Sequence, residues 1–458
     1  MDKLTILIDL WLSAASHLDA DRCAIIEDQA QGRRVCSYNN IEPLVESTCD
    51  ELYALGVRPN TPVFVAMKHS IEAVVLILSL WRIGAVYIPL ECAQDNATNK
   101  IMKIIPFFEE RPSKALFFVD ELKSEFCLIM PNFHLVETRL RCQNHLTGVR
   151  LRSHFSSMHP MAEFNSSRLS HLDFDKQWDC RPKRKKRRLH WSNEGAGSGI
   201  GGIINPGSQI ANIFHTSGST GCPKRVVISR KNVATRIDTL TQSGQTHAQL
   251  WFAPLNFDAS LNELIECLFN FGHFLIVSNA VKQDALKLVE CIGVYKVSRL
   301  ITTPQLLAGM DTKDSRLRSL KKVTSMGESP TEWGLKMQSD IPGAVLANEY
   351  GPTENTIQST SNSMKLSISN PNDIGSLVNQ VHGLVLKPDL KRAHHYRKCA
   401  PGEKGELFLS GKQLSPGYLS STATVNGFFY LRQVNSRVFE QVLTPGRGAL
   451  RWYKTQDF

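Results

Sequence analysis

One short segment, residues 214–227, limits the folds that this chain can adopt. It reads Phe-His-Thr-Ser-Gly-Ser-Thr-Gly-Cys-Pro-Lys-Arg-Val-Val, a run of hydroxyls and glycines that ends in Pro223 and Lys224. Largely apolar runs flank it, which favours a loop between two buried strands over a flexible Ser/Gly linker. The hydroxyls can donate hydrogen bonds, the glycines let backbone amides approach a ligand, and Lys224 adds positive charge. We therefore expect a phosphate-binding loop, and a nucleoside triphosphate suits it best.

The loop departs from the two best-known phosphate-binding patterns. It lacks the Gly-x-x-x-x-Gly-Lys-Ser/Thr spacing, and no Gly-x-Gly-x-x-Gly follows a strand here. It resembles instead the signature of the adenylate-forming superfamily, which contains acyl- and aryl-CoA ligases, luciferases and the adenylation domains of nonribosomal peptide synthetases. Further segments resemble other motifs of that superfamily, in the family's order: 81–90, 256–260, 348–354, 405–411 with 417–419, and 453–457. The resemblance covers about residues 15–458.

The composition agrees with a large enzyme. A chain of 458 residues that is 42% apolar and 21% charged can bury more than one core, so two or three subdomains are expected. The longest apolar run, 73–81, is too short to span a bilayer and favours a buried helix, so no membrane partner is expected. The N-terminus carries Asp2 and Asp9 and favours an amphipathic first helix over a signal peptide. Eleven scattered cysteines without a Cys-x-x-Cys pair indicate reduced thiols in a cytoplasmic protein.

The net charge of +10 is a local feature. The run from Arg181 to Arg188 supplies seven positive charges, and the rest of the chain is close to balanced. This run lies in a stretch, 139–208, that is rich in Ser, His, Arg, Asn and Gly and shows no persistent period, so we expect a disordered basic insertion. Three interpretations of the run stay open: a solvated loop, a nuclear import signal, and a tether to nucleic acid or an anionic surface.

The ordered parts alternate between strand-like and helix-like segments, which predicts an α/β fold with mostly parallel sheets and covering helices. Strands are expected at 61–67, 85–89, 274–277, 300–303 and 323–326, and a helix at 71–82. After residue 375 short apolar pieces separated by Pro and Gly predict a small β-rich subdomain. The expected parts are a first α/β part at 1–138, the insertion at 139–208, a second α/β part at 209–375 and the β-rich subdomain at 376–458.

The resemblance implies that ATP binds across several motifs and that Mg²⁺ accompanies it. It places Tyr350 against the adenine, Asp457 on the ribose, and Glu354 on Mg²⁺, whose hard charge favours oxygen ligands. Thr216, Lys224 and Glu354 are the expected catalytic residues. The expected ATP contacts are Thr216, Ser217, Gly218, Ser219, Thr220, Gly221, Lys224, Gly327, Glu328, Asn348, Tyr350, Gly351, Thr353 and Asp457.

The segment 256–260 bears on the substrate. By the resemblance, Asp258 stands where amino-acid-activating members place a carboxylate that binds the substrate ammonium. A buried ion pair is costly unless it is matched, so this carboxylate favours a cationic substrate group. By the same resemblance, polar residues in the pocket for the substrate side chain favour a substrate with a polar or basic side chain. The residues expected to line this pocket are Asn262, Ile301, Thr324, Met326, Glu349, Ile357 and Gln358.

The chain departs from the family pattern at two positions near the expected nucleotide. Arg225 stands where most members have glycine after the Pro-Lys pair, and Gln456 replaces the glycine before the ribose acid. Family members also continue beyond this motif into a C-terminal lobe. This lobe carries a catalytic lysine and rotates for the thioester step. We therefore expect the chain to be the large N-terminal part of an adenylating enzyme, weak or inactive alone.

These observations predict an ATP-dependent, AMP-forming ligase that activates an amino acid, with phosphopantetheine or CoA as acyl acceptor and a possible carrier domain as partner in the complete protein. The β-alanine-activating, aminoadipate-semialdehyde-dehydrogenase-like branch is one subtype that the Pro-Lys-Arg sequence allows. Two alternatives stay open: a fatty-acyl or aryl-CoA ligase, and an inactive nucleotide-binding module that uses its basic insertion for interaction.

Overall fold

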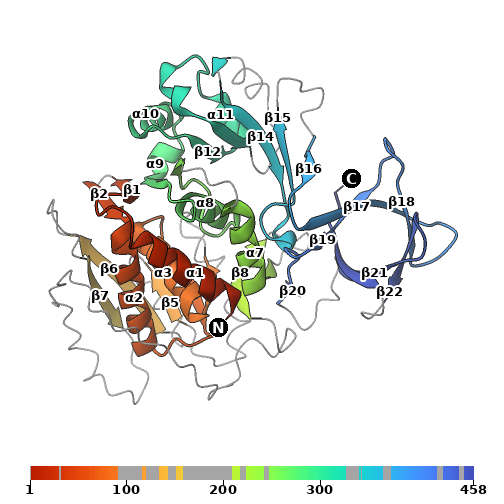
Figure 1. Cartoon of the computed structure of the whole chain (residues 1–458), viewed down its shortest axis with the longest axis horizontal. Helices are drawn as coiled ribbons and strands as arrows, with labels where there is room; N and C mark the ends of the chain where they lie inside the picture. Colours follow the sequence, from red (N-terminus) through yellow and green to blue (C-terminus); the bar gives the residue numbers. More distant parts are fainter. Residues whose placement is uncertain are drawn as a thin grey trace.

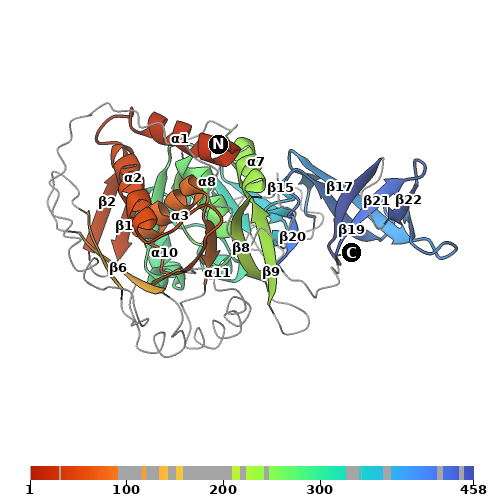
Figure 2. The ribbon, with the colours of Figure 1, turned by 90° about the horizontal axis from the view of Figure 1, so that it is seen from below.

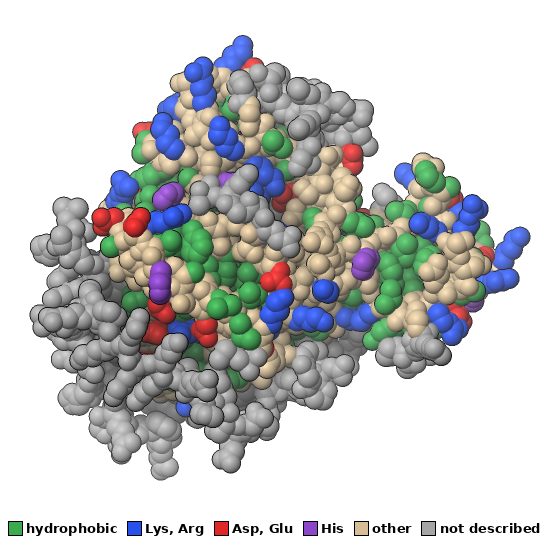
Figure 3. Space-filling model, in the orientation of Figure 1, with side chains coloured by type: hydrophobic (Ala, Val, Ile, Leu, Met, Phe, Trp, Pro, Cys, Tyr) green, Lys and Arg blue, Asp and Glu red, His purple; other side chains and the backbone are tan. Residues whose placement is uncertain are grey.

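The structure is a computed structural model of the chain. It describes residues 2–29, 32–90, 116–119, 134–142, 151–157, 209–216, 223–241, 247–325, 340–341, 343–364, 373–419, 427–442 and 448–457. Two sheets and their helices form a large body, and a small barrel projects from one side of it (Figures 1 and 2). In the space-filling view, Lys and Arg side chains gather along the boundary between body and barrel (Figure 3).

One sheet carries the expected phosphate loop at its end. Its strand order is β20-β9-β8-β4-β3-β5-β6-β7. The inner pairs are parallel, while β8–β9, β9–β20 and β6–β7 are antiparallel. The bounds are β3 Pro62–Ala66, β4 Val86–Pro89, β5 Leu116–Val119, β6 His134–Cys142, β7 Leu151–Ser157, β8 Ile210–Thr216, β9 Lys224–Ser229 and β20 Gly417–Tyr418.

The other sheet has the order β16-β15-β14-β13-β12-β10-β11-β1-β2. Its central pairs, from β14 to β1, are parallel, and antiparallel strands close both ends. The bounds are β1 Cys23–Gln29, β2 Gly32–Ser37, β10 Ala248–Leu250, β11 His273–Val277, β12 Arg299–Thr302, β13 Lys322–Ser325, β14 Val345–Tyr350, β15 Thr360–Met364 and β16 Ser376–Leu377.

Helices join the two sheets through one large core, and a second core lies under α10. The helix α3 is buried nearly all round, begins with a hydrogen bond from the Ala73 amide to the Ser70 side chain, and ends at Gly84 with φ of 83°. The helices are α1 Lys3–Ala15, α2 Tyr38–Ala54, α3 Ile71–Ile83, α7 Arg230–Leu240, α8 Ala259–Leu268, α9 Asn279–Lys282, α10 Ala285–Tyr295 and α11 Pro304–Ala308, with short 3₁₀ helices η4 Ser315–Ser319 and η5 Thr353–Asn355.

The remaining strands form a closed barrel in the order β17-β18-β22-β21-β23-β19. Leu386, Phe408, Leu431, Phe439 and Trp452 fill its interior. The bounds are β17 Val381–Pro388, β18 His395–Lys398, β19 Glu406–Gly411, β21 Phe428–Gln433, β22 Val438–Val442 and β23 Ala449–Lys454. Because closure leaves no sheet edge unpaired, the barrel is a small independent unit of packing.

The fold class expected from the sequence is confirmed: an α/β body with parallel sheet centres and a β-rich region after residue 375. The insertion expected at 139–208 needs a correction, because β6 runs to Cys142 and β7 covers Leu151–Ser157. The two strands pair antiparallel from Val136↔Ser157 to Cys142↔Leu151. Cross-strand backbone hydrogen bonds supply this order, and residues 151–157 lack the alternation that would reveal it. The run 181–188 lies outside the described residues, and the expected domain boundaries stay predictions.

Candidate active site

The two ends of the expected phosphate loop lie side by side. Thr216 ends β8, Lys224 begins β9, and the two residues are directly opposite in the antiparallel register. Cross-strand pairs of this kind hold their side chains about 5 Å apart at Cβ, so the hydroxyl and the ammonium share one region. Ser217, Gly218, Ser219, Thr220 and Gly221 lie outside the described residues.

The expected Mg²⁺ ligand and this lysine both contact Tyr418. Glu354 is in η5 and is 6% exposed, and its Oε1 accepts a hydrogen bond of 2.6 Å from the Tyr418 hydroxyl. The Lys224 Nζ lies 5.7 Å from the centre of the Tyr418 ring, a cation–π distance. Burial, together with the charge of Glu354, raises the pKa of Tyr418, so its hydroxyl stays a donor. These contacts join β9, η5 and β20 at one point.

The chemistry of this point fits Mg²⁺ held mainly by nucleotide phosphates. Among the described residues no group of three or more His, Cys, Asp or Glu side chains could hold a metal ion. Mg²⁺ commonly takes one or two protein carboxylates together with phosphate oxygens and water. Glu354 offers such a carboxylate, and Tyr418 contacts both it and the lysine of the phosphate loop.

The expected adenine and ribose residues are in direct contact. Tyr350 ends β14 in the body, and its hydroxyl donates to the Oδ2 of Asp457, which follows β23 of the barrel. Burial and the charge of Asp457 raise the pKa of Tyr350, so the phenol stays protonated. This part of the site therefore lies where body and barrel meet.

Neighbouring residues shape the Tyr350 loop. A Cβ added to Gly351 would lie 2.1 Å from the carbonyl oxygen of Ile357, so only glycine fits there. The Asn348 side chain donates to the Asp373 carbonyl at 3.0 Å. Gln456 has a φ of 70°, a backbone shape that favours the glycine found there in the resembling family. Thr353 lies in η5, while Gly327 and Glu328 lie outside the described residues.

Asp258 precedes α8 and holds an unusual loop in place. Thr356 and Ile357 have φ values of 55° and 74°, which are strained for β-branched residues. The Ile357 amide donates to the Oδ2 of Asp258 at 3.0 Å, and the Thr356 hydroxyl donates to the Gln413 carbonyl at 2.6 Å. Burial raises the pKa of Asp258 to about 6, although the hydrogen bond from Ile357 opposes the rise. A carboxylate made costly by burial favours a cationic ligand.

The expected pocket residues occupy adjacent strands. Ile301 on β12 and Thr324 on β13 are register partners and are buried. Glu349 on β14 accepts a hydrogen bond of 2.7 Å from the Lys322 Nζ. Burial acts to raise the pKa of Glu349, but the charges of Lys322 and Arg299 lower it overall, so this carboxylate stays ionised. Met326 lies outside the described residues.

The other two polar pocket residues, Asn262 and Gln358, bind a residue that sequence reasoning missed. Arg236 of α7 is 1% exposed, and its Nε and Nη2 donate to the Asn262 Oδ1 at 2.9 and 2.7 Å. Its Nη2 also donates to the Gln358 Oε1. Lys322 pairs with Glu349 and Arg236 with Gln358, so part of the polar surface that favoured a polar or basic substrate side chain is engaged within the protein. The Glu349 Oε2 and the Asn262 Nδ2 are buried without a hydrogen-bond partner among the described residues.

Sequence signals for the missed residues exist. Arg236 lies three residues after buried Val233 and beside buried Ile237, so it occupies the apolar face of its helix. A charged residue on such a face indicates a buried partner. Tyr418 lies within the 417–419 segment whose resemblance was noted, but the spacing alone does not connect it to Glu354.

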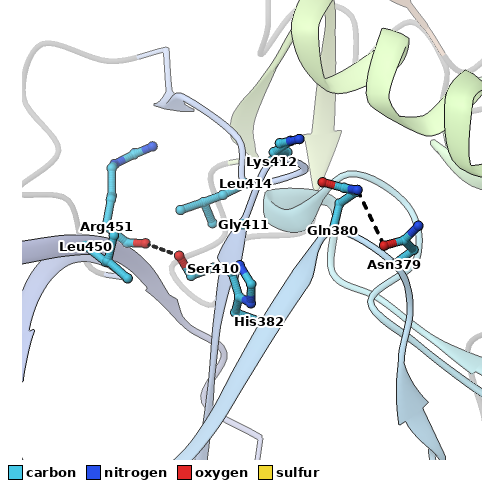
Figure 4. A pocket seen from close by; sticks show the side chains of 9 residues that line it. All are labelled: Asn379, Gln380, His382, Ser410, Gly411, Lys412, Leu414, Leu450 and Arg451. Carbon is cyan, nitrogen blue, oxygen red and sulfur yellow. Dashed lines mark hydrogen bonds between the residues drawn. The ribbon is translucent and has the colours of Figure 1, made fainter.

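A large cleft of about 550 Å³ lies at the base of the barrel, and none of the expected site residues lines it. Figure 4 shows its wall, where the Ser410 hydroxyl donates to the Arg451 carbonyl at 2.6 Å and the Gln380 side chain reaches Asn379. The Arg451 guanidinium donates to the Ser415 and Pro416 carbonyls, at 2.6 Å each. These donors therefore serve the loop before β20 rather than an anion.

Comparisons with known proteins bear on the family and the fold. The family model described as AMP-binding enzyme matches residues 12–419. The chain is 25% identical over 450 residues to a hybrid PKS-NRPS synthetase of a Fusarium species. This match covers 95% of this chain and 10% of that protein. It is 26% identical over 416 residues to N-(5-amino-5-carboxypentanoyl)-L-cysteinyl-D-valine synthase of Penicillium rubens. This match covers 87% of this chain and 9% of the synthase. The chain thus spans about a tenth of these relatives.

A solved structure shares the fold. The N-terminal subdomain of Klebsiella oxytoca NpsA in complex with 3-hydroxybenzoyl-AMSN matches with a TM-score of 0.67 and 19% identity, and the match covers 99% of this chain and 95% of that one. Among the helices that the structure describes, none is long and apolar enough to cross a membrane.

Proposed function

Because the chain belongs to the family of AMP-binding enzymes, we propose that it binds ATP between body and barrel and takes part in the activation of an amino acid to an aminoacyl-adenylate. In this reaction the substrate carboxylate attacks the α-phosphorus of ATP, an aminoacyl–phosphate bond forms, and pyrophosphate leaves. The contacts of Lys224, Glu354, Tyr350 and Asp457 support this proposal, since they bring together groups suited to phosphate, metal, base and ribose.

Charge develops on phosphate oxygens during this transfer, and fixed donors stabilise it. The Lys224 ammonium and the Thr216 hydroxyl, side by side on β9 and β8, would hold the β- and γ-phosphates. Mg²⁺, when bound with ATP, would neutralise phosphate charge. Glu354 would hold it, and Tyr418 orients that carboxylate by donating to one of its oxygens. Tyr350 would stack on the adenine, and Asp457 would accept from the ribose hydroxyls.

Asp258 is the observation that favours an amino acid over other acids. Its carboxylate is held at the loop 356–357, and its pKa is raised to about 6 by burial. A substrate ammonium would give this carboxylate a cationic hydrogen-bond donor in addition to the charge of Arg236, which interacts with it. The acyl group would then pass to a phosphopantetheine thiol of a carrier domain, a partner suggested by relatives of which this chain spans about a tenth.

The proposal is tested with acyl-sulfamate analogues of the adenylate, which bind without turnover. Calorimetry compares a glycyl analogue with its acetyl counterpart, which lacks only the amino group. The unaltered protein is expected to prefer the glycyl analogue, and Asp258→Asn to lose roughly 2 to 5 kcal/mol of that binding, because the ammonium loses its charged partner. Asparagine keeps an oxygen that accepts from Ile357, so the loop is preserved.

AMP serves as the control ligand, since it does not reach Asp258. Equal affinity for the two analogues in the unaltered protein would remove the amino-acid assignment and favour a fatty-acyl or aryl-CoA ligase. No AMP binding at all would remove the nucleotide site.

A further inference from the structure

We propose that Arg236 determines substrate size: its side chain fills the inner end of the acid pocket, so the protein accepts amino acids with little or no side chain. This inference rests on the proposed function and adds to it a substrate class and a specificity-determining residue.

The position of Arg236 is fixed from two sides of the pocket. Asn262 on α8 and Gln358 beyond η5 were both expected to contact the substrate side chain, and both accept hydrogen bonds from the guanidinium. Asn262 is 1% exposed and Gln358 6%. The space that two pocket residues would otherwise offer to a substrate is therefore occupied by protein.

Arg236 also borders a nearly filled space in the core. A cavity of about 10 Å³ lies beside Arg236, Asp258 and Ile357, and apolar side chains such as Phe214 and Leu261 close it. This is about the room that one water needs. The Arg236 Nη1 has no hydrogen-bond partner among the described residues, so a water there would satisfy it. Among the described residues, Arg236 occupies the place between Asn262 and Gln358 that a leucine or phenylalanine side chain of the substrate would need.

A different role, recognition of an anionic substrate side chain, fits the surroundings less well. The guanidinium already donates three hydrogen bonds, two to Asn262 and one to Gln358. The carboxylates of Glu349, Glu266 and Asp258 lie close enough to interact with its charge. The positive charge of Arg236 is thus balanced inside the protein. We therefore infer that Arg236 affects the substrate through the volume of its side chain and not through its charge.

The test measures affinities of a series of aminoacyl-sulfamate adenosine analogues, with glycyl, alanyl, leucyl, phenylalanyl and aspartyl groups, for three proteins. The unaltered protein is expected to bind the leucyl and phenylalanyl analogues at least roughly tenfold more weakly than the glycyl analogue, because overpacking a closed pocket is costly. Arg236→Ala is expected to abolish most of that difference. Arg236→Met keeps nearly the same volume without the charge, and is expected to preserve it.

The other outcomes overturn the inference in distinct ways. A protein that binds the large analogues as well as the glycyl one has no size limit. Tightest binding of the aspartyl analogue, lost in Arg236→Met, would show that Arg236 binds an anion instead. AMP binding without any aminoacyl binding would overturn the amino-acid function together with this inference. AMP affinity also reports folding, and if Arg236→Ala fails to fold, the unaltered protein and Arg236→Met decide the question.

Discussion

At the scale of single residues, charged side chains around the site form ion pairs with one another. Lys322 neutralises Glu349, and Arg299 pairs with Glu266. Asp258 differs, because its hydrogen bonds come from neutral groups such as the Ile357 amide and burial dominates its pKa. The charge of Arg236 interacts with Asp258, but the guanidinium gives its hydrogen bonds to Asn262 and Gln358. This difference singles out Asp258 as the residue that a cationic substrate would complete.

The raised pKa of Asp258 predicts how binding depends on pH. Above about pH 6 the carboxylate is ionised and can pair with an ammonium. Below it the carboxyl becomes protonated, so affinity for the glycyl analogue should fall by about tenfold per pH unit. Calorimetry between about pH 5 and 8 checks this. The acetyl analogue carries the same sulfamate and should show no such fall, and parallel curves for the two analogues would contradict the role of Asp258.

Tyr418 is predicted to act through Glu354. Tyr418→Phe removes the donor that orients the carboxylate at 2.6 Å. A hydrogen bond to a charged group contributes about 1.5 to 3 kcal/mol, so the gain in ATP affinity on adding Mg²⁺ should fall by roughly tenfold or more. AMP binding without Mg²⁺ should stay unchanged. Tyr396→Phe, which alters a barrel tyrosine, is the matched control, and an unchanged Mg²⁺ effect in Tyr418→Phe would exclude the positioning role.

At the scale of elements, the first helix is held to the core by one face. Trp11 of α1 is 6% exposed, stacks on Phe269 with ring centres 4.8 Å apart, and donates to the Leu268 carbonyl at 2.9 Å. Since Phe269 and Leu268 lie at the end of α8, which Asp258 precedes, this contact anchors the helix behind the site. Leu10, on the opposite face of α1, is 64% exposed.

These contacts predict a stability effect confined to one face of α1. Trp11→Ala should lower the free energy of unfolding by roughly 3 to 5 kcal/mol, because it empties a packed volume and removes one of the hydrogen bonds to the Leu268 carbonyl. Leu10→Ala should change it by less than about 0.5 kcal/mol. Denaturant unfolding followed by tryptophan fluorescence and circular dichroism measures both. Equal effects of the two substitutions would mean that α1 does not dock as described.

The elements differ in how far the sequence predicts them. Apolar spacing locates α3 and strands such as β3 and β13 within a residue or two, since burial sets their pattern. The strand β7 has no such pattern, because its order comes from pairing with β6. The positive φ values at Thr356 and Ile357 are likewise unforeseeable, since only the tertiary contacts of Asp258 and Gln413 make them tolerable.

The candidate site shows the same division. Motif resemblance predicted the residues that meet at one junction, including Lys224, Glu354, Tyr350 and Asp457. It could not predict that Arg236 occupies the space between Asn262 and Gln358, because the three residues are far apart in the chain and only the packing of α7 against α8 brings them together.

At the scale of the whole molecule, the site depends on the junction between body and barrel. Tyr350 comes from the body and Asp457 follows the last barrel strand, so the hydrogen bond between them crosses the junction. The loop at Ser415 extends this connection, since its amide donates to the Glu354 carbonyl and its hydroxyl to the Val227 carbonyl. Nucleotide binding at this junction should therefore stabilise the contact between body and barrel.

The most direct test of the account is calorimetric titration of the protein with AMP, alongside Tyr350→Ala, Tyr350→Phe and His382→Ala. A ring that stacks on a base contributes about 1 to 3 kcal/mol, so Tyr350→Ala should weaken AMP binding by roughly 5- to 150-fold. Tyr350→Phe keeps the ring and should bind AMP nearly as well. His382 lines the larger cleft, so its substitution should have no effect. An unchanged isotherm for Tyr350→Ala, or loss of binding in His382→Ala, would contradict the account.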